Sequence, residues 1–370
     1  MKWVYVPIMF ALAFIYTKTT LNTNGPEETS PRRITRGPAS EPIETQNINL
    51  KRVPAANLYK SFGSNALTPF TQVTSFEGVI VGNVHADSFG FIQDDRKKAS
   101  LGIIEFDEVT EGAFFHDVFS HLISVKNLDK KISWMNYFEY YKSGLMDLPH
   151  TNSYYVEKGI EEAGLEAEKL LEENITPDFP VEFKKLAKTH QHLDAVRKSQ
   201  IQNEIKKIYP KVQFFDLYQS NLNGGNYQAL IRIRPVDKIQ WVVINENSKT
   251  HYDQFFNKEQ LVEFQTRQQL IKNIVYDNKM DSSLKSFKIG RSHFVLSFKE
   301  NFASKIKWEQ IPEDDYHDCL MDQAYLLGKI HRRSLDTKVD SYIKAWAKIP
   351  AAIIDEKAVE LKFKLRDQVQ

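Results

Sequence analysis

The hydrophobic period changes along this chain, and that change limits the fold more than any other feature of the sequence. Glu77–Val81 and Ser100–Phe106 have the composition of strands. Apolar residues then recur at helical spacing in Ala113–Val125, from Val156 to Leu171, and in Val181–Ile208. The first half of the sequence therefore predicts a strand pair followed by helices.

The second half returns to strands. Asn226–Arg234 and Ile239–Asn245 alternate and are rich in β-branched residues, which predicts a hairpin. Leu261–Ile274 has a helical pattern, Ser292–Phe298 has that of a strand, and Asp318–Ser334 has that of an amphipathic helix. A strand pair, then helices, then a second sheet with helices together predict an α+β fold with two lobes.

The N-terminus has the pattern of an export signal. Lys2 precedes the apolar run Val4–Tyr16, whose 13 residues suit a signal-peptide core and fall short of the ~20 that span a bilayer. Residues 21–49 are rich in Gly, Pro and polar residues, which predicts a disordered linker. We therefore expect residues 1–20 to be a signal peptide or N-terminal anchor, and the protein to be exported, either periplasmic or secreted.

The remaining boundaries follow the change of pattern. We expect a loop-bearing helical lobe over residues 50–215, a hairpin-bearing lobe with C-terminal helices over 216–340, and a tail helix over 341–370. The 49 basic and 48 acidic residues balance, which argues against nucleic acid as a partner. The single cysteine, Cys319, excludes an internal disulfide and is expected to be buried on a helix.

The densest polar cluster is Gly82–Gly90, with the sequence Gly-Asn-Val-His-Ala-Asp-Ser-Phe-Gly. The acidic segment Glu105–Glu108 follows it, and then the pair His116-Asp117. Strand, polar loop, strand and acidic turn would place several carboxylates and a histidine at neighbouring strand ends. The pattern leaves three interpretations open.

The first interpretation is a metal-dependent hydrolase, because side chains in this stretch are of metal-ligand type. The candidates are His85, Asp87, Asp107, His116, Asp117 and His121. Against it, His116 and His121 are five residues apart and, at about 100° per residue, do not share one helix face. The second interpretation is structural, since buried side chains such as His85, Asp117 and His331 often satisfy loop backbone groups and do nothing more.

The third interpretation comes from a resemblance. Gly82–Gly90 is similar to the G-D-x-H-x-x-N-F-G loop of the bacterial domain-of-unknown-function 2252 family, Ile104–Glu108 to its N-D-F-D-E, and Gly112–Asp117 to its G-P-F-x-W-D. Asn223–Asn226 opens a hairpin as the family's Gly-rich turn does, and Leu327–Ser334 is similar to its L-A-x-A-H-A-R-S. The resemblance implies a permuted, protein-kinase-like fold related to aminoglycoside phosphotransferases, with any ligand in the cleft between its lobes.

The resemblance also implies roles for individual positions. The catalytic loop would contain Asn83, His85 and Asp87, and Asp117 would brace that loop. The residues that would hold Mg²⁺ are Ser88, Glu105 and Asp107. The residues that would bind ATP are Gly224, Gly225, Asn245 and Glu246.

Several of these positions have lost the chemistry that phosphotransfer needs. Asn83 stands where the family has an aspartate that takes or orients the acceptor proton, and an amide cannot accept a proton at neutral pH. Ser88 stands in place of a metal-binding asparagine, and Glu105 in place of an aspartate. Asn245 stands in place of the phosphate-binding lysine, for which Arg232 or Arg234 is a candidate substitute.

The losses favour a binding or regulatory pseudoenzyme in which ATP and Mg²⁺ bind weakly or not at all. An active phosphotransferase that uses Asp87 or Asp107 as its base stays an alternative, as does the hydrolase. The sequence names no substrate, partner or oligomeric state.

Overall fold

The structure is a computed structural model that describes residues 68–176, 182–183, 190–220, 226–234, 238–246, 264–280, 283–302 and 304–367. The chain divides into two compact units, Met1–Ile43 and Glu44–Gln370, and every element below belongs to the second unit. That unit mixes helices with antiparallel sheets, so the predicted α+β class is confirmed. The predictions for residues 1–49 and for Gly224 and Gly225 lie outside the described residues.

Two small antiparallel sheets hold the segments of the polar cluster. Strand β1 (Glu77–Ile80) pairs with β4 (Thr110–Ala113). Strand β2 (Phe89–Gln93) lies between β3 (Ala99–Ile103) and β11 (Ser304–Lys305). The polar loop connects β1 to β2, so both of its ends are tied into a sheet.

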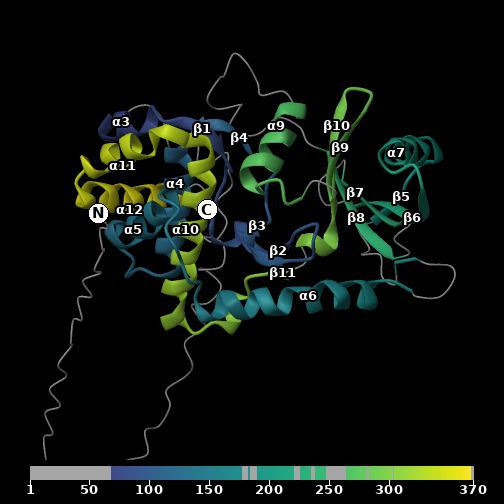
Figure 1. Ribbon diagram of the computed structural model, residues 1–370, viewed down its shortest axis with the longest axis horizontal. Coiled ribbons are helices and arrows are strands. Elements are labelled where there is room, and N and C mark those ends of the chain that lie inside the picture. Colours follow the sequence, from purple (N-terminus) through teal and green to yellow (C-terminus); the bar gives the residue numbers. More distant parts are fainter. Residues whose placement is uncertain are drawn as a thin grey trace, which may run out of the picture. The chain divides into compact units, whose positions relative to one another are not determined.

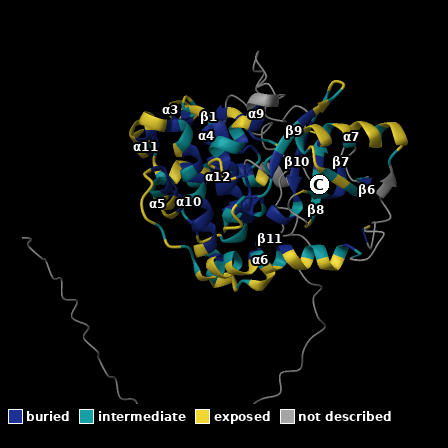
Figure 2. Ribbon diagram, turned by 45° about the vertical axis from the view of Figure 1, so that its right-hand side comes forward, coloured by how far each residue is buried: buried dark blue, intermediate teal, exposed yellow. Residues whose placement is uncertain are grey.

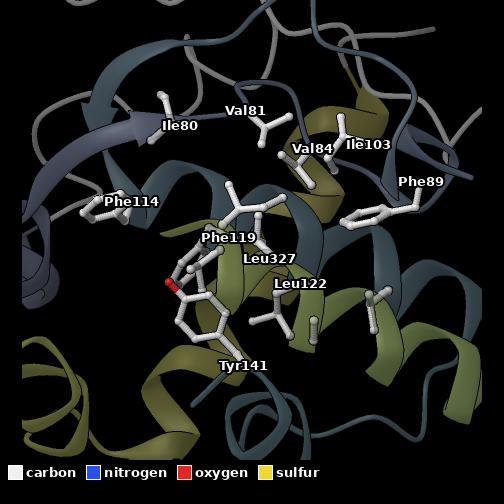
Figure 3. Packing of buried hydrophobic residues seen from close by; sticks show 14 of the residues in the cluster. Ile80, Val81, Val84, Phe89, Ile103, Phe114, Phe119, Leu122, Tyr141 and Leu327 are labelled. Atoms are coloured by element: carbon white, nitrogen blue, oxygen red, sulfur yellow. The ribbon is translucent and has the colours of Figure 1, made fainter. Parts of the chain in front are cut away.

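Helices pack around these sheets (Figure 1). They are α3 (Thr71–Thr74), α4 (Phe114–Leu128), α5 (Trp134–Leu145), α6 (Tyr154–Asn174), α10 (Tyr316–Leu335), α11 (Val339–Ala347) and α12 (Ala351–Asp367). Helix α4 is buried along most of its length, and Figure 2 shows exposed positions along α6. Figure 3 shows Val81 and Val84 of the loop in the same buried cluster as Leu122 of α4 and Leu327 of α10.

Helices α5 and α10 cross closely because each has a glycine at the contact. A Cβ added to Gly144 would lie 2.0 Å from the carbonyl oxygen of Tyr325, and one added to Gly328 would lie 2.1 Å from that of Tyr141. Any larger residue at either position would push the helices apart. The close crossing brings side chains of α5 within hydrogen-bonding distance of α10.

A six-stranded antiparallel sheet forms the second part of the unit. Its strands, in spatial order, are β5 (His190–His192), β6 (Val212–Ser220), β7 (Asn226–Ile233), β8 (Ile239–Glu246), β10 (Ser292–Phe298) and β9 (Leu284–Ile289). Helix α7 (Ala195–Ile208) covers one face of the sheet through Ile201 and Ile205. Helix α9 (Phe264–Leu270), which continues as a π-helical turn, lies in sequence between β8 and β9. The hairpin predicted over residues 226–245 is confirmed as β7 and β8.

Several elements differ from the sequence predictions. His190–His192 is a strand within the stretch predicted as one long helix, because it pairs with the edge of β6. Strand β6 crosses residue 215, where the boundary between lobes was expected. The predicted tail helix is two helices interrupted at Pro350, a residue that cannot donate the backbone hydrogen bond of a continuous helix.

Helix α12 contributes Ile354, Ala358 and Leu361 to the main core, so the C-terminal segment is part of the packed unit. Cys319 is buried on α10 as predicted, and burial raises the pKa of its thiol to about 11. Among the helices of the described residues, none has the length and apolar character that a membrane crossing requires.

Candidate functional site

The loop of residues 81–88, between β1 and β2, is the centre of the candidate site. It passes through Gly82, whose φ of +76° is the left-handed conformation that favours glycine. A Cβ added to Gly82 would lie 2.5 Å from the carbonyl oxygen of Glu108. Glycine therefore lets the loop pack directly against the acidic turn 105–108. The expectation that these two segments lie side by side is confirmed.

Asp117 of α4 accepts hydrogen bonds from the backbone at the start of the loop. Its Oδ2 accepts a hydrogen bond from the backbone N–H of Val81 at 2.7 Å, and its Oδ1 accepts one from Gly82 at 3.0 Å. The carboxylate also accepts from Nε2 of His331 at 3.0 Å, and Nδ1 of His331 lies 2.6 Å from the Tyr141 hydroxyl. Burial raises the pKa of the Asp117 carboxyl, while the contact with His331 opposes that rise. The bracing role expected of Asp117 is confirmed.

A second chain of hydrogen bonds runs parallel to the first. His121 is fully buried, and burial lowers its pKa to about 4, so the imidazole is neutral near pH 7. Its Nε2 lies 3.0 Å from Oε1 of Gln323, which can only accept, so Nε2 carries the proton and Nδ1 accepts from the Tyr137 hydroxyl at 3.0 Å. Gln323 then donates from its Nε2 to the carbonyl oxygen of Ala86 at 3.0 Å. This relay fixes the end of the loop.

Three polar side chains on one face of α4 support the loop, two of them directly. Asp117 bonds to its start, the Oγ of Ser124 accepts from the backbone N–H of Ala86 at 2.9 Å, and His121 acts through Gln323. Their spacing of four and then three residues places them in one row. Sequence analysis did not identify Ser124 or Gln323. The only available signal was a polar residue recurring at helical spacing inside an apolar stripe.

His85 and Asp87, the ionisable residues of the loop, also lie beside other side chains of the protein. Nε2 of His85, a buried residue, lies 3.2 Å from Oε2 of Glu105, but neither ring nitrogen of His85 makes a hydrogen bond among the described residues. Asp87 accepts a hydrogen bond from the indole N–H of Trp308 at 3.0 Å. Asp107, by contrast, is exposed. Of the three acidic candidates, Asp107 alone has neither a hydrogen bond nor an ion pair within the described part of the chain.

The three predicted Mg²⁺ residues do not present themselves as a ligand set. The Ser88 hydroxyl is buried, accepts from the backbone N–H of His85 at 3.2 Å and faces the carbonyl oxygen of Asn83 at 3.4 Å, so it closes the turn. Glu105 lies against His85. Among the residues that the structure describes, no group of three or more His, Cys, Asp or Glu side chains is placed to hold a metal ion.

The hairpin residues predicted to bind ATP lie on β8. Asn245 is opposite Asn226 and Val295 in the sheet, and Glu246 is exposed at the end of the strand. Within the described ranges, neither side chain makes a hydrogen bond or ion pair with the loop. Arg232 on β7 stacks on the ring of Phe215, 5.1 Å from its centroid, and Arg234 is exposed just beyond the end of β7.

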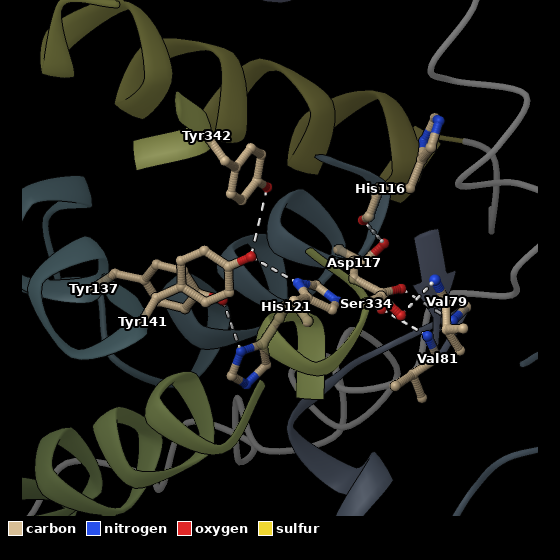
Figure 4. A network of polar contacts seen from close by, with 12 residues as sticks. Val79, Val81, His116, Asp117, His121, Tyr137, Tyr141, Ser334 and Tyr342 are labelled. Atoms are coloured by element: carbon tan, nitrogen blue, oxygen red, sulfur yellow. Dashed lines mark hydrogen bonds and ion pairs between the residues drawn. The ribbon is translucent and has the colours of Figure 1, made fainter. Parts of the chain in front are cut away.

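The side chains that suggested a metal-dependent hydrolase are not gathered as metal ligands among the described residues. Asp117 and His121 are engaged in the two relays, and Figure 4 shows the His116 imidazole pointing away from the Asp117 carboxylate. The structural interpretation therefore describes Asp117 and His331 well. Comparisons with protein-family models, curated proteins and solved structures found no match.

Proposed function

We propose that this chain is a ligand-binding pseudoenzyme with a permuted, kinase-like fold. Support for the fold comes from the order of elements in the large sheet. In kinase-like enzymes a Gly-rich turn precedes the strand that carries the phosphate-binding lysine, and a helix follows that strand. Here β6 and β7 flank Gly224 and Gly225, β8 carries Asn245 at the lysine position, and α9 follows.

The observation that carries the proposal is the contrast between the loop and its support. Asp117, Ser124 and Gln323 hold the loop through hydrogen bonds to its backbone. Yet the position that would be held for proton transfer carries Asn83. Loss of a general base typically costs about 10²–10⁴ in rate. A scaffold that keeps its supports without its base fits a role in binding better than one in turnover.

The neighbouring carboxylates do not readily replace the missing base. Asp87 is hydrogen-bonded to Trp308, and Glu105 lies beside His85. Asp107 is exposed and has no such partner among the described residues. The alternative of an active phosphotransferase therefore rests on Asp107.

Two measurements on the full chain separate these functions. Thermal-shift titration with ATP, with and without Mg²⁺, measures binding, because a ligand of the native state raises the melting temperature. Transfer from radiolabelled ATP to a panel of acceptors measures turnover. We expect no transfer by the native protein.

The variant Asn83→Asp restores the missing carboxylate, and Asp107→Ala removes the remaining candidate base, with Asp87→Asn as the matched control. Mg²⁺-dependent transfer by the native protein that Asp107→Ala abolishes and Asp87→Asn preserves would refute the pseudoenzyme. Transfer that appears only in Asn83→Asp would support it strongly.

A further inference from the structure

A cavity of about 420 Å³ lies apart from loop 81–88, between α6, the turn that joins β2 to β3, the start of β8 and the 3₁₀ turn η5 (Lys299–Phe302). Its volume is within the range of small-molecule sites. The charged and polar residues that matter for its chemistry are Lys97, Glu161, Glu168, Lys238, Gln240 and Glu300. Leu165, with 60% of its surface exposed, also lines it.

Glu300 is a buried carboxylate with one unused oxygen. The residue is only 8% exposed. Its Oε1 accepts from the backbone N–H of Trp241 at 3.3 Å, whereas its Oε2 is buried without a hydrogen-bond partner in the described residues. Burial raises the pKa of this carboxyl. Hydrogen bonds from the backbone N–H groups of Glu300 and Trp241 oppose the rise in part, and the charges of Lys97 and Lys238 oppose it less. A buried carboxylate oxygen without a donor is costly, so the protein retains it at the expense of stability.

Gln240, which lines the same cavity, has a second unused acceptor. Its Oε1 is also buried and has no hydrogen-bond partner among the described residues. Both residues line one cavity, so a molecule bound there can supply the donors that the two side chains lack within the described residues. A cationic group with several N–H donors meets both needs, because it also compensates the charge of Glu300.

The lysines add a complementary feature. Lys97 and Lys238 are exposed, and neither has an ion-pair partner in the part of the chain that the structure describes. Both are close enough to Glu300 to affect its ionisation. Cations beside a cavity whose buried acceptors require donors suit a ligand that carries charges of both signs.

We propose that this cavity binds a small zwitterion with an ammonium or guanidinium group and a carboxylate, as free amino acids and short peptides have. The cationic group pairs with the Glu300 carboxylate on the side of the cavity that Gln240 also lines, and the ligand's carboxylate pairs with Lys97 and Lys238. Glu161 and Glu168 of α6 provide further negative charge around the cationic end. The site shares no residue with loop 81–88, so the proposal does not depend on the pseudoenzyme assignment.

Isothermal calorimetry and thermal shift on the full chain test the site with three probes. L-arginine carries both charges, agmatine lacks the carboxylate, and acetate lacks the cation. We expect arginine to bind and to raise the melting temperature, agmatine to bind more weakly, and acetate not to bind. If ordered water satisfies the two acceptors instead, no probe binds and the proposal fails.

Variants locate the binding. Glu300→Gln keeps the shape of the side chain and removes its charge, so we expect arginine affinity to fall at least about tenfold, as for loss of a charged hydrogen bond. Glu173→Gln, an exposed glutamate near the end of α6, is the matched control and should bind as the native chain does. Equal affinity in Glu300→Gln and native protein would overturn the proposal.

Two further variants keep the test decisive if Glu300→Gln does not fold. Lys97→Ala with Lys238→Ala changes only exposed side chains, and the double variant should lose the preference for arginine over agmatine. Asp107→Ala should bind arginine normally. A loss of arginine binding in Asp107→Ala would move the site to the loop and overturn the assignment.

Discussion

Asp117 and His121 beneath loop 81–88 and Glu300 beside the cavity are all buried, but they differ in whether their polar atoms have partners. Beneath the loop, Asp117 and His121 use their side-chain polar atoms in hydrogen bonds within the chain. Around the cavity, Glu300 Oε2 and Gln240 Oε1 have no hydrogen-bond partner among the described residues. Satisfied buried groups hold a structure together, whereas unsatisfied ones weaken it unless something else binds them. The contrast indicates that the groups beneath the loop stabilise the fold, whereas those beside the cavity are available to bind a ligand.

The largest effect on stability is expected from removing Asp117, whose carboxylate is hydrogen-bonded within the chain. Asp117→Ala leaves the N–H groups of Val81 and Gly82 without an acceptor and His331 without its carboxylate. We expect the free energy of unfolding to fall by about 3–5 kcal/mol, as when a buried ion pair loses one partner. Urea denaturation measures the change. The exposed Asp314→Asn is a control that should leave stability unchanged, and an equal loss in both variants would contradict the bracing role.

The pH dependence of stability tests the neutral relay. Burial lowers the pKa of His121 to about 4 from an ordinary 6.5, so between these values the unfolded chain binds more protons than the native one. Stability contributed at this site is complete above about pH 6.5 and falls as the pH drops toward 4, by about 1.4 kcal/mol per unit and about 3 kcal/mol in all. Urea denaturation at pH 7 and 4.5 should show a steeper loss in the native protein than in His121→Gln. Parallel losses would show that His121 is not the group that titrates.

The two tyrosines of α5 sharpen the comparison between relays. Tyr137→Phe removes the donor to His121, and Tyr141→Phe removes the hydroxyl beside His331. Each leaves a buried imidazole nitrogen without a partner, so we expect each to cost about 1–3 kcal/mol. Tyr141→Phe should cost more, because its relay ends on a carboxylate. Guanidinium denaturation of the two variants side by side decides the order, and an equal cost would argue that charge plays no part.

The smallest effect on stability is expected from replacing Glu300, whose Oε2 has no hydrogen-bond partner among the described residues. Because the pKa of Glu300 is raised by burial, ionising it weakens the fold as the pH rises through that value. In the absence of any ligand, Glu300→Gln should therefore raise stability at pH 7 slightly, by at most about 1 kcal/mol. Thermal melts in ligand-free buffer measure this. A large loss of stability would mean that the carboxylate supports the fold and is not held in reserve for a ligand.

Much of this architecture could be predicted from local sequence patterns. The amphipathic period of α6 and α10, the alternation of β7 and β8, and the polar loop before β2 could each be predicted from neighbouring residues. The bracing by Asp117 was expected from a resemblance, and its hydrogen bonds agree. The edge strand of the large sheet was harder to predict, because His190–His192 becomes a strand only when β6 lies beside it.

Long-range pairings account for the rest. His331 and Gln323 lie more than 200 residues from their partners Asp117 and His121, and no local period indicates which buried groups will meet. His331 also meets Tyr141 of α5, and that contact depends on the close crossing of α5 and α10 at Gly144 and Gly328, which is a property of packed backbones. The cavity beside Glu300 likewise needs α6, β8 and η5 together, since a void exists only between elements that are already in place.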